Sequence, residues 1–203
     1  MTCFDGWLPL AQRYDSPHFD ARPDPADISL LVVHNISLPL GCFGAPHVSD
    51  LFTGRIDYNA DPSFADLRGL KVSSHFFIRR DGRIIQYCSA NDRAWHAGRS
   101  CFNGREKCND FSIGVELEGS DVVPFEAAQY AALASLTIAL RQYYPLTDVQ
   151  GHEHIAPGRK TDPGPYFDWD FYRNLLNKKA MDEPALVAAI AGLRVVKGVP
   201  QSQ

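Results

Sequence analysis

The stretch "DISLLVVHNIS", residues 27–37, decides the fold of this chain. It is a nearly continuous apolar run that contains Val and Ile and ends in polar residues. Runs of this kind are typical of strands that are buried on both faces of a sheet. We therefore predict a buried strand here, with His34 near its C-terminal end.

Two neighbouring segments predict further strands. Residues 71–89, "KVSSHFFIRRDGRIIQYCS", contain two β-rich runs that meet at Asp81-Gly82, a pair that tolerates the positive φ of a tight turn. This pattern indicates a hairpin. Residues 111–119, "FSIGVELEG", alternate apolar residues with polar or small ones, which predicts a strand with one polar face.

Helices are predicted mainly in the second half of the chain. Residues 124–144 are rich in Ala and Leu, and Pro124 is acceptable in a first helical turn. Residues 170–179 indicate a shorter amphipathic helix. We expect a domain over residues 1–180, followed by a tail at 181–203 that forms a short helix and is then disordered.

The remaining segments predict loops. Residues 38–70 are rich in Pro, Gly and Asp, and short helices are expected around residues 47–55 and 62–70. Residues 93–110 show little periodicity and indicate a long functional loop. Together these elements predict an α/β fold: a single domain with a central mixed β-sheet flanked by α-helices.

The composition excludes several classes of protein. The chain has 203 residues, of which 45% are hydrophobic and 22% charged, enough for one sizeable core. A formal net charge of −4 argues against a nucleic-acid-binding protein, which would usually be basic. No apolar run reaches the roughly 18 residues of a membrane span, and the N-terminus does not resemble a secretory signal. We therefore expect a cytoplasmic protein that does not bind membranes.

The cysteines support the same compartment. Their number is odd and no CxxC pair occurs, so free thiols are expected instead of a disulfide framework. None lies in a recognisable nucleophile motif, which argues against a cysteine hydrolase. The five are Cys3, Cys42, Cys88, Cys101 and Cys108.

The chemistry is concentrated in "VQGHEHIAPGRKTDPGPYFDW", residues 149–169. Its prolines and glycines predict a rigid loop that is neither a regular helix nor a buried strand. A hydrolytic zinc site needs three protein ligands of the His, Asp or Glu type, with a fourth position left for water. His152 and Asp162 lie on the two arms of this loop, and His34 is the best candidate for the third ligand. Each residue alone is more often structural, so the hypothesis rests on the combination.

Three other residues have competing interpretations. Glu116 is either a solvent-exposed carboxylate or the general base of a zinc hydrolase, and Glu118 shares its face of the strand. Lys160 is either a surface lysine or a group that stabilises an oxyanion. His154 is not expected to be a ligand, because alternate side chains of a non-helical segment point to opposite sides. His75, His96, Trp95 and Lys107 are possible residues of the same cleft, whereas His18 and His47 have no evident partner.

Five separated motifs together resemble the zinc-dependent N-acetylmuramoyl-L-alanine amidases. They are "LLVVHNIS", "VSSHFFIRRDGRIIQY", "RAWHAG", "GREKCNDFSIGVELEG" and "GHEHIAPGRKTDPGPYFDW". The resemblance covers roughly residues 5–178 and extends to peptidoglycan recognition proteins and phage amidase lysozymes. It implies an amidase-like fold and hydrolysis of the amide between 1,6-anhydro-N-acetylmuramic acid and L-alanine.

The resemblance also assigns roles to individual residues. It implies that His34, His152 and Asp162 hold Zn²⁺, that Glu116 is the family's catalytic acidic residue, and that Lys160 is the family's basic residue. Glu118 is then structural.

Four residues are implied to bind substrate. Asn35 would donate a hydrogen bond to the peptide, and Trp95 would form an apolar wall for the sugar. Lys71 and Lys107 stand where relatives tend to have Arg, which keeps the charge but loses a planar two-point grip on a carboxylate.

The implied biology is cell-wall recycling by a monomer whose partner is an anhydro-muropeptide. Removal of such muropeptides would also limit β-lactamase induction. Two alternatives remain at this point: a lysin that acts on polymeric cell wall, and a non-catalytic muropeptide sensor.

Overall fold

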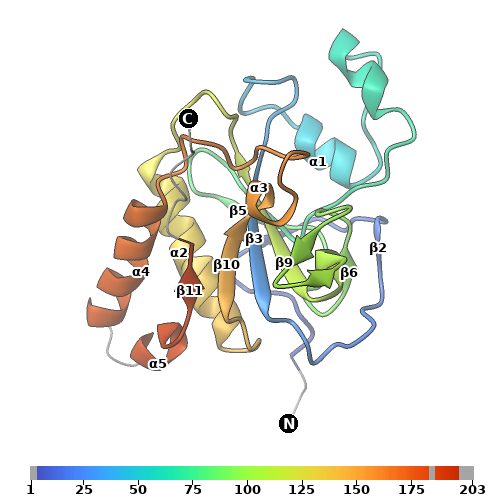
Figure 1. Cartoon of the computed structure of the whole chain (residues 1–203). Coiled ribbons are helices and arrows are strands. Elements are labelled where there is room, and N and C mark those ends of the chain that lie inside the picture. Colours follow the sequence, from blue (N-terminus) through green and yellow to red (C-terminus); the bar gives the residue numbers. More distant parts are fainter. Residues whose placement is uncertain (1–3, 183–185, 197–203) are drawn as a thin grey trace.

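The computed structural model describes residues 4–182 and 186–196 and contains one large sheet with helices on both sides (Figure 1). The sheet has seven strands in the order β1-β5-β4-β9-β3-β10-β11. The hairpin β4–β5 is antiparallel and the other pairings are parallel, so the sheet is mixed, as predicted. These strands are β1 (Gln12–Arg13), β3 (Leu30–Ile36), β4 (Phe76–Ile78), β5 (Ile84–Gln86), β9 (Ser112–Glu118), β10 (Asp148–Gly151) and β11 (Arg194–Val195).

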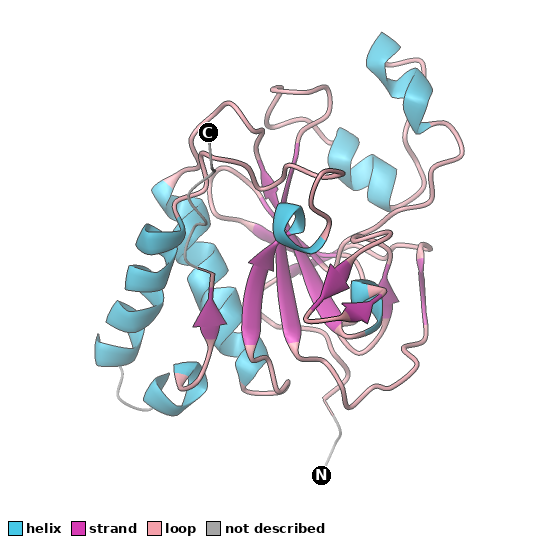
Figure 2. Cartoon of the chain, viewed as in Figure 1, coloured by secondary structure: helices cyan, strands magenta, loops and turns pink. Residues whose placement is uncertain are grey.

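Short elements complete the structure (Figure 2). Two small two-stranded sheets pair β2 (Phe19–Asp20) with β6 (Arg93–Ala94) and β7 (Cys101–Phe102) with β8 (Arg105–Glu106). The helices are α1 (His47–Phe52), α2 (Ala127–Arg141), α3 (His152–Ile155), α4 (Trp169–Asp182) and α5 (Val187–Ile190), with 3-10 turns η1 (Pro62–Leu67) and η2 (Cys108–Asp110). None of the helices in the described residues is long and apolar enough to cross a membrane.

The central strand β3 separates two apolar layers because successive side chains point to opposite faces. Leu31 and Val33 belong to the main core, which α2 and α4 cover on one face of the sheet. Leu30 and Val32 pack on the other face against a smaller cluster that includes Ile155 of α3. His34 follows Val32 on this second face, at the C-terminal end of the strand.

Several predicted elements are confirmed. The buried strand predicted at residues 27–37 is β3, and the helix predicted at residues 124–144 is α2. The predicted hairpin turns at Asp81-Gly82, where Gly82 has φ +85° and an added Cβ would lie 2.9 Å from the carbonyl oxygen of Ala128. Glycine is therefore required at this turn by both its backbone angle and the close approach of α2.

The prediction that residues 149–169 contain no strand or helix was wrong at their start. β10 lies parallel to β3, and α3 follows it for one turn. The strand carries only one strongly apolar residue, Val149, so its pattern is too weak to reveal a buried strand. Backbone hydrogen bonds to both neighbouring strands make this segment a strand, although its side chains show no strand pattern.

The strand β9 needs a similar correction. Its polar face exists, but all seven residues are buried, so the interpretation of Glu116 as a solvent-exposed carboxylate was wrong. His96, in the segment at residues 93–110, covers the start of this face at Ser112 and Gly114. This segment is more ordered than predicted because it contains β6, β7, β8 and η2.

The end of the chain contributes a strand that the sequence did not predict. β11 pairs with β10, and Arg194 binds the buried Asp148 through Nε–Oδ1 at 2.7 Å and Nη2–Oδ2 at 2.5 Å. α5 is the short helix expected here, and the disorder predicted for the tail falls partly on residues 197–203, which lie outside the described residues. The domain boundary at residue 180 falls within the last turn of α4 and stays a prediction.

The four cysteines in the described residues are free thiols, as predicted. Cys3 lies outside the described residues.

Candidate metal centre

Two histidines meet at the C-terminal edge of the sheet because their strands are parallel neighbours. His34 lies near the end of β3, and His152 follows directly after β10, where Gly151 pairs with Val33. The carboxyl ends of adjacent parallel strands open onto the same edge of a sheet, which is where ligands of α/β proteins commonly bind. Both side chains are almost fully buried, with 1% and 2% of their surface exposed.

Asp162 is brought to the same point by the turn that follows α3. The backbone N–H of Glu153 donates to the carbonyl oxygen of Asp162 at 2.8 Å, and Asn35 Nδ2 donates to the carbonyl oxygen of Pro163 at 3.0 Å. These two bonds hold the turn against the end of the sheet on both sides of the carboxylate.

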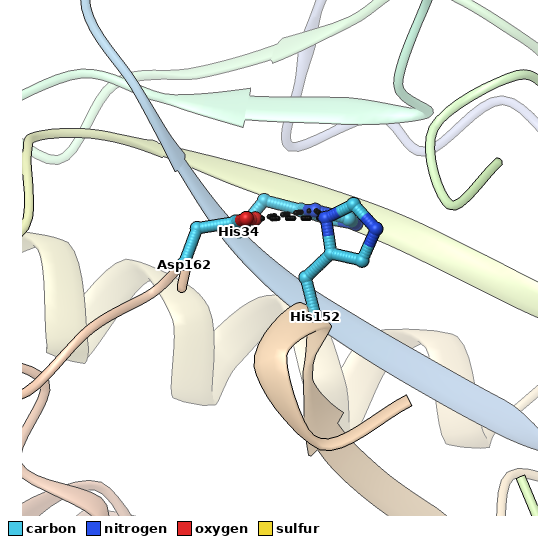
Figure 3. Close-up of side chains that lie close together, drawn as sticks. All are labelled: His34, His152 and Asp162. Atoms are coloured by element: carbon cyan, nitrogen blue, oxygen red, sulfur yellow. Dashed lines mark hydrogen bonds and ion pairs between the residues drawn. The ribbon is translucent and has the colours of Figure 1, made fainter. Parts of the chain in front are cut away.

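The three side chains point toward one another (Figure 3). His34 Nδ1 lies 3.0 Å from His152 Nδ1 and 2.9 Å from Asp162 Oδ2, and His152 Nδ1 lies 3.0 Å from the same oxygen. Tetrahedral zinc with bonds of roughly 2.0–2.2 Å would hold its ligand atoms roughly 3.3–3.6 Å apart. The observed triangle is slightly tighter than this and fits a zinc ion after small side-chain movements.

The electrostatics of the triangle also fit a cation. Burial lowers the pKa of His34 to about 4, so its imidazole is neutral near pH 7. Burial alone would raise the pKa of Asp162, but hydrogen bonds from His152 and His34 outweigh it and leave the pKa below its usual range. Metal ligands must be neutral imidazole and ionised carboxylate, and His34 and Asp162 are in these forms near pH 7.

Glu116 stands next to the triangle because it pairs in register with His34 across β3 and β9. Its Oε1 lies 4.0 Å from His34 Nδ1, and its buried Oε2 has no hydrogen-bond partner within the described residues. Burial raises the pKa of Glu116 well above its usual value, the charge of Asp162 adds to this, and Lys160 opposes it. An orphaned, buried carboxylate oxygen of this kind is costly unless a ligand or ion completes it.

Lys160 is exposed and lines an open cleft of about 410 Å³ beside the triangle. Asn35 and Asp162 line the same cleft. Lys160 therefore lines the same cleft as one of the three converging side chains, Asp162.

Asn35 is already engaged within the protein. Its Nδ2 donates to Asp121 Oδ1 at 2.7 Å as well as to Pro163. Both amide protons are thus committed, and an Asn35 that donates to a substrate has to give up one of these bonds.

The other predicted substrate-binding residues lie apart from the triangle. Trp95 donates from Nε1 to Asp20 Oδ1 at 3.1 Å and stacks on His18 with ring centroids 6.2 Å apart. Lys107 lines a second cavity of about 480 Å³. Lys71 is exposed before β4 and is not among the residues that line either cavity.

Sequence reasoning gave no role to two residues of this region. Asp121 lies just beyond the end of β9 and faces the cleft, a position that a polar residue after a strand at this edge could have indicated. Arg159 lines both cavities, and its Nη2 donates to the carbonyl oxygens of Ala97 at 2.7 Å and Arg99 at 2.6 Å. These contacts join segments some sixty residues apart, and no local pattern reveals them.

The comparison with known families decides which kind of site this is. The family model described as N-acetylmuramoyl-L-alanine amidase matches residues 24–165, which contain all three converging side chains and Glu116. The chain belongs to this amidase family. The resemblance predicted from the five motifs is confirmed.

Two relatives of this amidase have names that specify one reaction. It is 55% identical over 185 residues to the 1,6-anhydro-N-acetylmuramyl-L-alanine amidase AmpD of Citrobacter freundii, which covers 90% of this chain and 99% of that protein. The amidase of the same name from Escherichia coli K12 is 56% identical over 181 residues, covering 88% and 99%.

Solved structures agree with the fold of this amidase. A crystal structure of a selenomethionine AmpD derivative matches with a TM-score of 0.83 at 56% identity, covering 87% of this chain and 99% of that one. The amidase AmiD of E. coli, solved with anhydro-N-acetylmuramic acid-L-Ala-D-γ-Glu-L-Lys, matches with a TM-score of 0.54 at 32% identity, covering 77% and 60%.

Proposed function

We propose that this amidase uses zinc to hydrolyse the amide between 1,6-anhydro-N-acetylmuramic acid and L-alanine in muropeptides. The observation that carries the proposal is the convergence of His34 Nδ1, His152 Nδ1 and Asp162 Oδ2 within 3.0 Å of one another beside a buried carboxylate. The substrate follows from the relatives, whose names specify the anhydro sugar and the L-alanine amide.

The three converging side chains would hold Zn²⁺ as neutral imidazoles and an ionised carboxylate. When bound, zinc supplies Lewis acidity, which lowers the pKa of water and polarises a carbonyl oxygen. Glu116 accepts a proton from the attacking water at the free Oε2. As the C–N bond breaks, the same carboxyl group returns this proton to the nitrogen of the departing alanine. The products are the carboxylic acid of the sugar's lactyl group and a free amine.

Lys160 stabilises the negative charge that develops on the carbonyl oxygen during attack. Asn35, Trp95, Lys71 and Lys107 bind the substrate outside the reacting bond. The two lysines serve as point charges for peptide carboxylates, without the bidentate geometry of Arg.

The proposed setting is the cytoplasm, where a monomeric enzyme recycles cell-wall fragments and limits β-lactamase induction by removing muropeptides. Residues 1–180 are proposed to form the catalytic domain. Neither nucleic acid nor a membrane is a partner in this proposal.

The test is incubation of the purified protein with anhydro-muramyl-tripeptide, with and without a zinc chelator, followed by mass analysis. The expected products are the anhydro sugar and the intact tripeptide, formed only without chelator. Cleavage at another bond, or cleavage unaffected by complete removal of metal, would contradict the proposal. A parallel digestion of intact cell walls distinguishes a lysin, since the proposed enzyme is expected to prefer the soluble muropeptide.

A further inference from the structure

The two ligand histidines both turn Nδ1 toward the centre, so the Nε2 atom of each points away from it. Both Nε2 atoms meet consecutive residues of one segment. His34 Nε2 lies 2.9 Å from His96 Nδ1, and His152 Nε2 lies 3.0 Å from the carbonyl oxygen of Ala97. Histidines that bind metals usually donate their second N–H to such a group, which fixes the ring and its tautomer.

We propose that His96 is a positioning residue that directs the Nδ1 lone pair of His34 at the metal, while Ala97 does the same for His152. The inference rests on the proposed metal site. The carbonyl oxygen of Ala97 can only accept, so in the zinc-bound protein His152 Nε2 carries the proton, and Nδ1 gives up its hydrogen bond to Asp162 and presents its lone pair to the metal. His96 Nε2 lies 3.3 Å from Ser112 Oγ, an atom that can accept its proton, and this leaves His96 Nδ1 as the acceptor for His34.

The strand β9 is shaped to admit the His96 ring. A Cβ added at Gly114 would lie 2.5 Å from Cγ of His96, closer than real side chains allow. Glycine in the interior of a strand weakens the strand and often marks a close approach by another group. Here that group is His96, whose ring meets the His34 ring edge-on with centroids 5.1 Å apart and an angle of 86°.

The backbone of the segment is fixed independently of the two histidines. Asn109 Oδ1 accepts from the backbone N–H groups of His96 at 3.3 Å and of Ala97 at 2.8 Å. Arg159 Nη2 donates to the carbonyl oxygen of Ala97 at 2.7 Å. The acceptors are thus held in place before any metal binds.

The first test compares two substitutions of His96 in the full-length protein. His96→Leu removes the acceptor, whereas His96→Asn places Oδ1 close to the position of Nδ1. His47→Leu is the matched control, because His47 packs on Phe64 in the α1–η1 region. The measurement is the zinc dissociation constant by competition with a chromophoric chelator.

We expect His96→Leu to weaken zinc binding by about 10–100-fold, the usual effect of removing such a partner. His96→Asn should recover most of the affinity, and His47→Leu should bind like the parent protein. Parent-like affinity in His96→Leu, or equal losses in the Leu and Asn variants, would overturn the inference. A parent protein that binds no zinc would instead overturn the proposed function.

A second measurement needs no variant, so it tests the positioning role of His96 even if His96→Leu does not fold. In ¹⁵N-labelled, zinc-loaded parent protein, a scalar coupling across the hydrogen bond should connect His34 Nε2 with His96 Nδ1, with the proton on His34. A proton on His96 Nδ1, or no coupling between the two nitrogens, would overturn the inference.

Discussion

The buried floor of the candidate site and three exposed lysines are built in opposite ways. The floor consists of His34, Glu116 and His152, each no more than 8% exposed and each attached to the end of a strand or the turn that follows it. Lys71, Lys107 and Lys160 are exposed and lie on segments without regular secondary structure.

This difference explains which assignments the geometry supports most strongly. Register between parallel strands fixes the floor, so its atoms meet without help from a ligand. The lysines depend on loop conformation and on solvent-screened charge, which contributes little at exposed positions. Substitutions in the floor should therefore change chemistry most. Among the lysines, Lys160 should matter more than Lys71 and Lys107, because it lines the cleft together with Asp162.

The largest effect is expected for Glu116→Gln, which keeps the shape of the side chain but removes the proton acceptor. General acid–base catalysis contributes typically ~10²–10⁴-fold, so kcat should fall by this amount while zinc stays bound. The readout is kcat on anhydro-muramyl-tripeptide together with zinc content.

Glu118→Gln is the matched control on the same face of β9. Glu118 accepts from the backbone N–H groups of Gly44 at 2.6 Å and Arg80 at 3.1 Å, so its loss should lower stability and leave kcat nearly unchanged. Equal losses of kcat in the two variants would contradict the role given to Glu116.

A smaller but still large effect is expected for Lys160→Ala. Removing one group that stabilises an oxyanion typically costs ~10²–10³-fold in kcat. Lys178→Ala is the control: it removes a positive charge on the exposed side of α4, away from the cleft, and should leave kcat unchanged. A Lys160→Ala enzyme with parent-like kcat would place Lys160 among residues that do no chemistry.

A further buried histidine, His75, predicts that the stability of the protein depends on pH. Burial, assisted by the charge of Arg22, lowers the pKa of His75 to about 3, and its Nδ1 accepts from the backbone N–H of Gly114. Below about pH 6.5 the unfolded chain protonates His75 and the folded protein does not, so stability falls as pH falls. This residue should contribute up to about 1.4 kcal/mol per pH unit.

The comparison is between the metal-free parent protein and His75→Asn, which keeps an acceptor for Gly114. Urea unfolding near pH 7 and near pH 5 should show a flatter pH dependence in the variant. The same slope in both proteins would contradict a buried, neutral His75.

The smallest effect is expected for Lys107→Ala and Lys71→Ala. An exposed ion pair is worth about 0.2–1 kcal/mol, so KM should rise by no more than about fivefold with kcat unchanged. The difference should shrink as salt increases. A kcat loss comparable to that of Glu116→Gln would remove the distinction between the floor and the lysines.

The same contrast explains how far the sequence alone could predict the molecule. β3 and α2 have long, strong patterns, and His34 and Glu116 are located by the strands that carry them. β10 and β11 are short and weakly apolar, and only their pairing with neighbours makes them strands. The polar face of β9 is buried by distant groups, His96 at its start and the backbone of Gly44 and Arg80 at Glu118, and the periodicity of a single strand does not show what covers it.

The contacts of the two ligand histidines with the segment at His96 and Ala97 were the least predictable from the sequence. His96 meets His34 across sixty-two positions of sequence. A glycine within a strand pattern, such as Gly114, signals that some group approaches closely but does not identify it.

The central claim is that one ion is held by side chains from β3, α3 and the turn after it. The most direct measurement is anomalous diffraction at the zinc edge from crystals of the zinc-loaded protein. The account predicts one peak about 2.0–2.2 Å from His34 Nδ1, His152 Nδ1 and a carboxylate oxygen of Asp162. A peak elsewhere, or no peak between these atoms at saturating zinc, would contradict it.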